Sequence, residues 1–286
     1  MSFSCPPTLR LLPRLFKDFH KGWVDAQWHC QARWVGADWR WILMKIRFFF
    51  WLTLLVLISF VDAAALKIHI ISGAKEYQSE ASMKSFSAWM EKHYDVKFTA
   101  SWGHDGIGKL PNLEALKNAD VMFVFARRMK IEEPQMKLIR AHWQAGKPIV
   151  GVRTASHAFQ KADNEIFDRQ VMGGNYLGHF SDEPVKVTHV VKDHPVLRGV
   201  KVFPSGKLYK AGPLAKGTTV LQQGDIGTDK QMVTWVNTWK GGRTFYTSLG
   251  VPEDFENENF KRLLANAIYW TAKRKPDQRI SKNPKQ

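Results

Sequence analysis

Charged and imidazole side chains follow directly on a short apolar run near the middle of this sequence. Residues 149–152 are Ile-Val-Gly-Val, and residues 153–157 read Arg-Thr-Ala-Ser-His. The guanidinium of Arg153 suits an oxyanion, a carboxylate or a group of hydroxyls held in a fixed place. The imidazoles of His157 and His179 have an ordinary pKa of about 6.5, so they can exchange a proton near neutral pH. We therefore expect Arg153, His157 and His179 to be the catalytic residues if the protein is an enzyme.

Other polar side chains lie in loops that follow predicted strands. Ligands bind at the carboxyl ends of the strands in an open parallel sheet, so loops from separated parts of the chain can meet there. We expect these loops to form one polar cleft. Imidazoles beside fixed arginines are the groups that proton transfer next to a carbonyl requires. The expected substrate-binding residues are Arg127, Arg128, Thr154, Ser156, Asn175, Tyr176, His104, Asp105 and Glu253.

Two kinds of nucleophilic chemistry are excluded or disfavoured. The cysteines are Cys5 and Cys30, so the chain from Met44 onward has no cysteine nucleophile and no cysteine-bound metal. Ser156 and His157 are adjacent, and neighbouring side chains at a helix start point about 100° apart. We therefore expect them not to form a nucleophile–base pair, and no G-x-S-x-G pattern surrounds the serine.

The histidines do not have the spacing of a local metal motif such as H-E-x-x-H. His104, Asp105, His157 and His179 could converge on a divalent ion, but isolated histidines more often make single hydrogen bonds. The glycines at 106 and 108 lack the third glycine of a dinucleotide-binding fingerprint. We expect no metal and no cofactor.

The elements that must position these residues alternate between strand and helix. The β-rich runs of the first half are 67–72, 95–100, 120–126 and 149–152. Helical spacing between them, at 83–93 and 132–145, predicts an α/β domain with a mainly parallel sheet. The second half is richer in strands, with predicted strands at 185–191, 232–238 and 243–249, the last two joined by a hairpin turn. A closing amphipathic helix is expected over 255–273.

The first 65 residues differ in character from the rest. A basic start at Met44, an uncharged and mostly apolar run over 48–61 and the small residues 63–65 are the three parts of a secretory signal peptide. We expect a signal peptide at 44–65, with residues 1–43 a misassigned upstream extension. The apolar run is short for a membrane span of about 20 residues, and an uncleaved N-terminal anchor is the alternative. The expected location is the periplasm or the extracellular space.

The chain is basic overall, with 42 Lys and Arg against 26 Asp and Glu and a net charge of +16. The basic residues are scattered apart from a basic tail at 276–286. No zinc-finger spacing, basic zipper or RNA-binding aromatic signature accompanies them, so we expect no nucleic-acid partner. Contact with a membrane is expected only through the 44–65 segment, if it stays uncleaved.

Five stretches carry short motifs in a fixed order. They are 119–128, 146–159, 173–179 (which begins Gly-Gly-Asn-Tyr), 194–200 (which begins His-Pro) and 241–250. Together they resemble the ThuA-like (trehalose-utilisation) family of the class I glutamine amidotransferase-like superfamily, over a domain of residues 66–275. The amidotransferases have a cysteine nucleophile where this chain has Arg153, and a guanidinium cannot replace it, so no glutaminase activity is expected.

The resemblance implies a flavodoxin-like three-layer α/β/α domain and a small carbohydrate as ligand, a disaccharide or its keto form. Two functions stay open. In an enzyme of sugar isomerase or lyase type, His157 or His179 would move a proton next to the carbonyl. Arg153 would then stabilise the developing oxygen charge, while Asn175 or Tyr176 orients hydroxyls. The alternative is a carbohydrate-binding module without catalysis.

Overall fold

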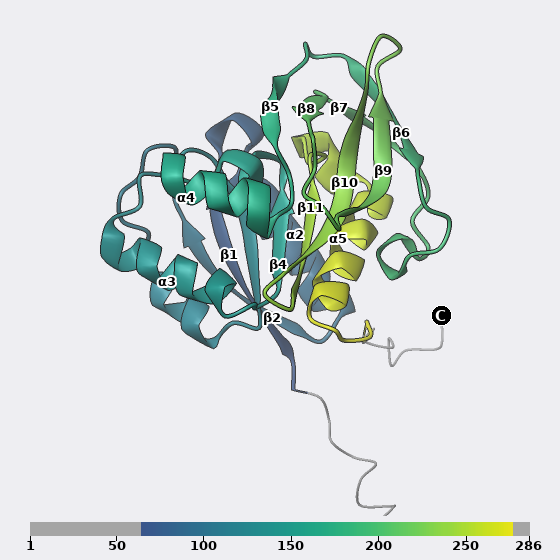
Figure 1. Cartoon of the computed structure of the whole chain (residues 1–286). Helices are drawn as coiled ribbons and strands as arrows, with labels where there is room; N and C mark the ends of the chain where they lie inside the picture. The colour runs from purple at the N-terminus through teal and green to yellow at the C-terminus, as the bar shows by residue number, and fades with distance from the viewer. Residues whose placement is uncertain (1–63, 277–286) are drawn as a thin grey trace, which may run out of the picture. The chain divides into compact units, whose positions relative to one another are not determined.

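The computed structural model describes residues 64–276 (Figure 1). The predicted upstream extension 1–43, the predicted signal peptide 44–65 except its last two residues, and the predicted basic tail 276–286 except Pro276 lie outside this part of the chain. No helix within residues 64–276 combines the length and the apolar character needed to cross a membrane.

One nine-stranded sheet organises the domain. Five strands run parallel in the order β2 (Val96–Trp102), β1 (Leu66–Gly73), β3 (Val121–Ala126), β4 (Ile149–Val152) and β11 (Gly242–Thr247). Antiparallel strands continue it in the order β10 (Lys230–Trp239), β9 (Thr219–Asp225), β6 (Pro184–His189) and β7 (Pro204–Gly206). The α/β class is confirmed, but the sheet is mixed rather than mainly parallel, because the predicted hairpin extends it with an antiparallel half.

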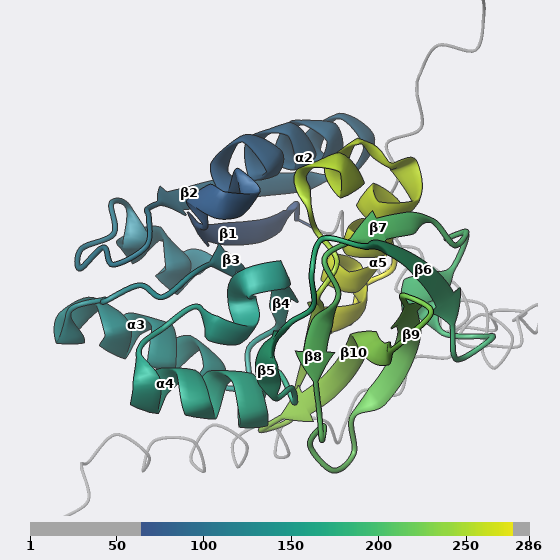
Figure 2. The ribbon, with the colours of Figure 1, turned by 90° about the horizontal axis from the view of Figure 1, so that it is seen from above.

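Helices cover both faces of this sheet (Figure 2). Helices α2 (Ser79–His93) and α5 (Glu258–Thr271) lie on one side, and α3 (Glu133–Gln144) and α4 (Lys161–Ile166) lie on the other. Strand β3 is buried on both faces, with Phe123 and its alternate neighbours facing one core and Met122 and its alternate neighbours facing the other. This two-residue alternation explains why the run is apolar throughout.

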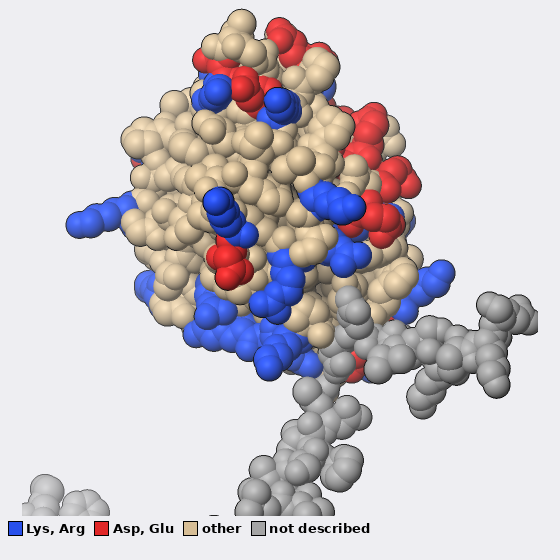
Figure 3. Space-filling model, turned by 90° about the vertical axis from the view of Figure 1, so that its right-hand side faces the viewer, with Lys and Arg blue, Asp and Glu red and all other residues tan. Residues whose placement is uncertain are grey.

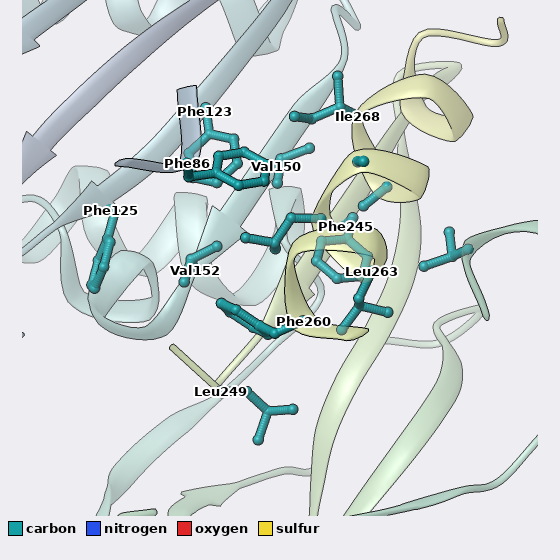
Figure 4. Close-up of a cluster of buried hydrophobic side chains, with 14 of the residues drawn as sticks. Phe86, Phe123, Phe125, Val150, Val152, Phe245, Leu249, Phe260, Leu263 and Ile268 are labelled. Carbon is teal, nitrogen blue, oxygen red and sulfur yellow. The ribbon is translucent and has the colours of Figure 1, made fainter. Parts of the chain in front are cut away.

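The core beneath α2 and α5 is rich in aromatic rings (Figure 4). Phe86 of α2 packs against Phe123 of β3 with ring centroids 6.0 Å apart, and Phe260 of α5 packs edge-on against Phe255 at 5.1 Å. Side chains of α5 fall on one buried face at helical spacing, as the sequence predicts for Phe260, Leu263, Leu264, Ala267, Ile268 and Thr271. Burying each large apolar side chain stabilises the fold by about 1.5–3 kcal/mol.

Short helical elements connect the main ones. They are the 3₁₀ helices η2 (Lys75–Tyr77), η3 (Leu113–Asn118), η4 (Arg153–His157), η6 (Pro195–Leu197) and η7 (Pro252–Glu256), and a π-helical turn η5 (Phe167–Val171). Two of them, η4 and η5, contribute residues to the candidate site. A separate two-stranded sheet pairs β5 (Tyr176–His179) with β8 (Tyr209–Ala211). Figure 1 shows β5 and β8 at the end of the main sheet where β4 finishes.

Candidate functional site

The chain turns sharply where β4 ends. Arg153 has φ of +53°, a left-handed conformation that costs a non-glycine residue about 1–2 kcal/mol. The Tyr246 hydroxyl donates a 2.7 Å hydrogen bond to the Arg153 carbonyl and holds the turn. The turn leads into η4, which brings Ser156 and His157 to the carboxyl end of the sheet.

The Arg153 side chain does not reach an open surface. It is 1% exposed, and its guanidinium lies between the rings of Tyr77 and Tyr209, 4.6 and 4.2 Å from their centroids. It donates to the Ser248 carbonyl, and its Nε has no hydrogen-bond partner. The structure therefore places Arg153 beneath the site as a connection between distant segments, where a substrate would not touch it.

A polar hollow of about 440 Å³ lies among η4, α4, η5 and β5. Its lining residues are Arg128, Ser156, His157, Phe159, Lys161, Asn164, Glu165, Asp168, Arg169, Asn175 and Tyr176. Five of these, Arg128, Ser156, His157, Asn175 and Tyr176, were predicted from the sequence as site residues. We take this hollow as the candidate functional site.

His157 stacks on Tyr176, with ring centroids 4.3 Å apart and an interplanar angle of 23°. Burial is the main cause that lowers the pKa of His157, to about 3, and the positive charges of Arg128, Arg127 and Arg153 lower it further. The imidazole is thus neutral at pH 7 and binds protons weakly. It suits hydrogen bonding to a ligand better than proton abstraction.

Ser156 and His157 are closer than the sequence predicts. The Ser156 Oγ lies 3.1 Å from His157 Nδ1, so the expectation that the two side chains diverge is wrong. The tight 3₁₀ turn, rather than a regular α-helix, brings them together. A serine nucleophile is still poorly supported, because Ser156 is buried and its neighbour has a strongly lowered pKa.

Asp168 is a site residue that the sequence analysis missed. Its side chain lines the hollow although the residue is only 5% exposed. One carboxylate oxygen accepts a 2.8 Å hydrogen bond from the backbone N–H of Tyr176, and the other, buried oxygen has no partner. Burial raises the pKa of Asp168 from 3.8 to about 6. Asp168 lies in the π-helical turn, a feature common at functional sites, which no local sequence pattern indicates.

Tyr209 was also missed, and several predicted residues surround it. Its buried ring lies 4.9 Å from that of Tyr176, 6.0 Å from that of His157 and 6.5 Å from that of His179. His179 itself is exposed on β5, with Nδ1 2.8 Å from the Phe180 carbonyl oxygen. It lies near the hollow but does not line it.

The predicted arginines of the β3 loop differ in their surroundings. Arg127 forms ion pairs with Asp105 and, at 3.6 Å, with Glu76, so its charge is balanced by acids outside the hollow. Arg128 is exposed, and its backbone N–H donates a 2.8 Å hydrogen bond to the His157 carbonyl. This bond ties the β3 loop to η4.

The remaining predicted residues are dispersed. Thr154 is fully buried, and Asn175 donates a 3.1 Å hydrogen bond to the Gly212 carbonyl at the edge of the hollow. His104 lines a separate hollow of about 550 Å³ beside the start of α2, and Glu253 lines another of about 520 Å³ beside η7. The nine predicted binding residues therefore do not share one cleft.

Metal binding receives no geometric support within residues 64–276. No three His, Cys, Asp or Glu side chains there gather closely enough to hold an ion. His157 and His179 both lie near the Tyr209 ring, whereas His104 lies in the separate hollow beside α2.

Several solved structures share the fold of this domain. Among solved structures, a ThuA-like protein from Bacteroides uniformis superimposes with a TM-score of 0.57 at 18% identity, covering 74% of this chain and 94% of the other. A ThuA-like protein from Parabacteroides merdae gives 0.56 at 15% identity, covering 76% and 94%. A cytoplasmic protein from Salmonella typhimurium gives 0.50 at 13% identity, covering 72% and 99%. At these identities the likeness establishes the fold alone.

No curated protein sequence matches this chain. The sequence model of the ThuA family, described as trehalose utilisation, matches residues 67–271, which is nearly the whole described domain. The chain therefore belongs to the ThuA family.

Proposed function

We propose that the hollow binds a small carbohydrate and that the protein transfers a proton next to a sugar carbonyl. One observation carries this proposal. Asp168, a buried carboxyl group with an unpartnered oxygen, lines the hollow, and its pKa of about 6 allows both protonation states near neutral pH. Keeping such a group buried opposes folding, so its presence is easiest to explain by a task at the site.

The other lining groups suit a sugar ligand. The stacked rings of His157 and Tyr176 offer an aromatic surface and neutral polar atoms for hydroxyls. In the proposed reaction, the Asp168 carboxylate takes a proton from the carbon next to the carbonyl. The electron pair of that C–H bond forms the C=C bond of an enediolate, and the carbonyl oxygen gains negative charge. Arg169, which also lines the hollow and whose charge acts on Asp168, faces that negative charge, and Asp168 returns its proton to carbon.

Binding without catalysis is the second candidate. It is favoured by the strongly lowered pKa of His157, which makes the predicted histidine base weak at neutral pH. On this view the hollow only recognises sugar hydroxyls, and Asp168 is a hydrogen-bonding group.

A ligand screen tests the proposed site. Thermal-shift measurements against disaccharides and their keto forms should identify a stabilising ligand, and Tyr176→Ala should abolish the shift. Glu253→Gln, which changes the separate hollow beside η7, serves as the matched control and should keep it. Melting temperatures without ligand show whether each variant is folded. If the ligand-induced rise in melting temperature survives Tyr176→Ala but disappears in Glu253→Gln, the ligand binds in the hollow beside η7 and the proposal is wrong.

Two broader expectations accompany this function. We propose that the protein is exported, and the signal-like segment 44–65 supports this. N-terminal sequencing of the secreted protein would test it by finding a start at Ala64 or Leu66.

We also propose that the domain is a flavodoxin-like three-layer variant. Its five parallel strands between helices on both sides support that assignment.

A further inference from the structure

We infer that the carbohydrate taken by this hollow carries a carboxylate or similar anionic group, held by Arg128 and Lys161. The inference rests on the proposed function and deepens it by naming the substrate class as acidic sugars. The inference comes from the charged side chains that line the hollow, because two of the three basic ones form no ion pair.

The two basic side chains named above have no carboxylate partner within the described residues. Arg128 and Lys161 are both exposed and line the hollow, and neither forms an ion pair there. The third cation of the hollow, Arg169, pairs with Glu165 at 3.3 Å. The other acid, Asp168, offsets one further charge, so three basic side chains of the lining stand against two acids. The hollow therefore has an excess of positive charge.

Neighbouring arginines outside the hollow are neutralised. Arg127 pairs with Asp105 and Glu76, and Arg140 pairs with Asp163 at 2.9 Å and with Glu133. On the side of the molecule shown in Figure 3, several basic side chains gather toward the lower edge, and acidic ones lie mainly at the right and the top. The unpaired cations of the hollow thus differ from the neighbouring arginines Arg127 and Arg140, which are paired.

The position of Arg128 is fixed by its backbone. Its φ is +45°, its N–H donates to the His157 carbonyl at 2.8 Å, and its carbonyl accepts from the Gly106 N–H at 3.1 Å. A guanidinium that starts from a fixed backbone loses less conformational freedom when it binds a planar carboxylate. The geometry therefore favours a carboxylate over a group that binds by charge alone.

The anionic and the hydroxyl ends of such a ligand would be recognised by different groups. The charge of Arg128 acts on His157 and Tyr176, whereas the cation that acts on Asp168 is Arg169. Arg128 therefore belongs to the His157 side of the hollow. The ligand's carboxylate would therefore meet Arg128 at the exposed side of the hollow, away from the buried, unpartnered Asp168 oxygen.

Matched pairs of neutral and acidic sugars test the inference. The probes are glucose against glucuronate and maltose against maltobionate, with acetate as a simple anion, each titrated calorimetrically at low ionic strength. We expect at least one acid to bind tenfold or more tightly than its neutral partner. Arg128→Gln should remove that preference, while Lys137→Gln, an exposed lysine on α3, should retain it. The acid should also raise the pKa of His157, followed by NMR.

The outcomes separate the inference from the proposed function. If a neutral sugar binds as tightly as its acid and Tyr176→Ala abolishes both, the sugar site stands and the acidic-substrate inference is overturned. If acetate binds as tightly as the acidic sugars, the site is a general anion site and the inference fails as well. If the acids bind with Arg128 dependence but without Tyr176 dependence, the proposed sugar-stacking role is the part that fails.

Discussion

Replacing Asp168 by Asn should make the folded protein more stable at neutral and higher pH. The wild-type carboxyl is buried, one of its oxygens has no partner, and its pKa rises from 3.8 to about 6 on folding. A raised pKa means that the folded state favours the protonated form, so ionisation at higher pH opposes folding. An amide removes that charge and still accepts the bond from the Tyr176 N–H.

The magnitude follows from the pKa change. About two pKa units at 1.36 kcal/mol each give a gain of roughly 3 kcal/mol above pH 7. The gain should shrink through pH 6 and 5 and approach zero below about pH 3, where the wild-type carboxyl is protonated in both states. The stability difference between Asp168→Asn and wild type should therefore be about 1–2 kcal/mol larger at pH 8 than at pH 5.

Urea denaturation of both proteins at pH 5 and pH 8 measures this difference. Because variant and wild type share every other titrating group, the effects of the buried histidines cancel. Asp229→Asn, an exposed aspartate between β9 and β10, is the matched control and should change stability by less than about 0.5 kcal/mol. An Asp168→Asn protein that is less stable than wild type by the same amount at both pH values would refute the reasoning.

Three further perturbations follow from the fold. Arg153→Ala should lower the free energy of unfolding by about 3 kcal/mol or more, because it opens a cavity between two tyrosines and leaves the Ser248 carbonyl without its donor; equal urea midpoints for variant and wild type would disprove the connecting role. Phe86→Ala should cost about 3–5 kcal/mol through loss of the packing beneath α2, and a cost below about 1 kcal/mol would mean that this core is misplaced. Burial lowers the pKa values of His69 and His142 to about 4. As pH falls from 6.5 toward 4, the unfolded chain gains a proton at each histidine before the folded chain does. Each histidine should therefore lower the free energy of unfolding by about 2–3 kcal/mol over this range, with no loss above pH 6.5. His142→Gln should flatten the acid side of the stability profile, and an unchanged slope in urea melts between pH 7 and 4.5 would contradict this.

The main elements could be predicted because their patterns are local. The continuous apolar runs of the parallel strands β3 and β4 and the one buried face of α5 are visible within a few residues of sequence, and both were confirmed. The antiparallel half was only partly visible, since β9 and the short strand β7 have weak patterns and depend on pairing with distant segments. The same holds for the separate β5–β8 sheet.

The site was predictable only in part because it depends on contacts between distant residues. Arg153 was expected in an open cleft, but tyrosines 76 residues before it and 56 residues after it enclose its guanidinium. Asp168 and Tyr209 stand in stretches without a local motif, and only the folded chain brings them to His157 and Tyr176. His157 carried the clearest local signal, and the structure places it in the hollow.

Hydrogen exchange at carbon tests the central claim most directly. A keto-disaccharide that stabilises the protein is incubated with it in D₂O, and NMR follows deuterium entering the C–H position next to the carbonyl. The account predicts exchange with wild type, a loss of at least about a hundredfold with Asp168→Asn and no change with Asp229→Asn. Exchange at the wild-type rate in a folded Asp168→Asn protein, or bound ligand without any exchange in wild type, would contradict the claim that Asp168 transfers a proton at this site.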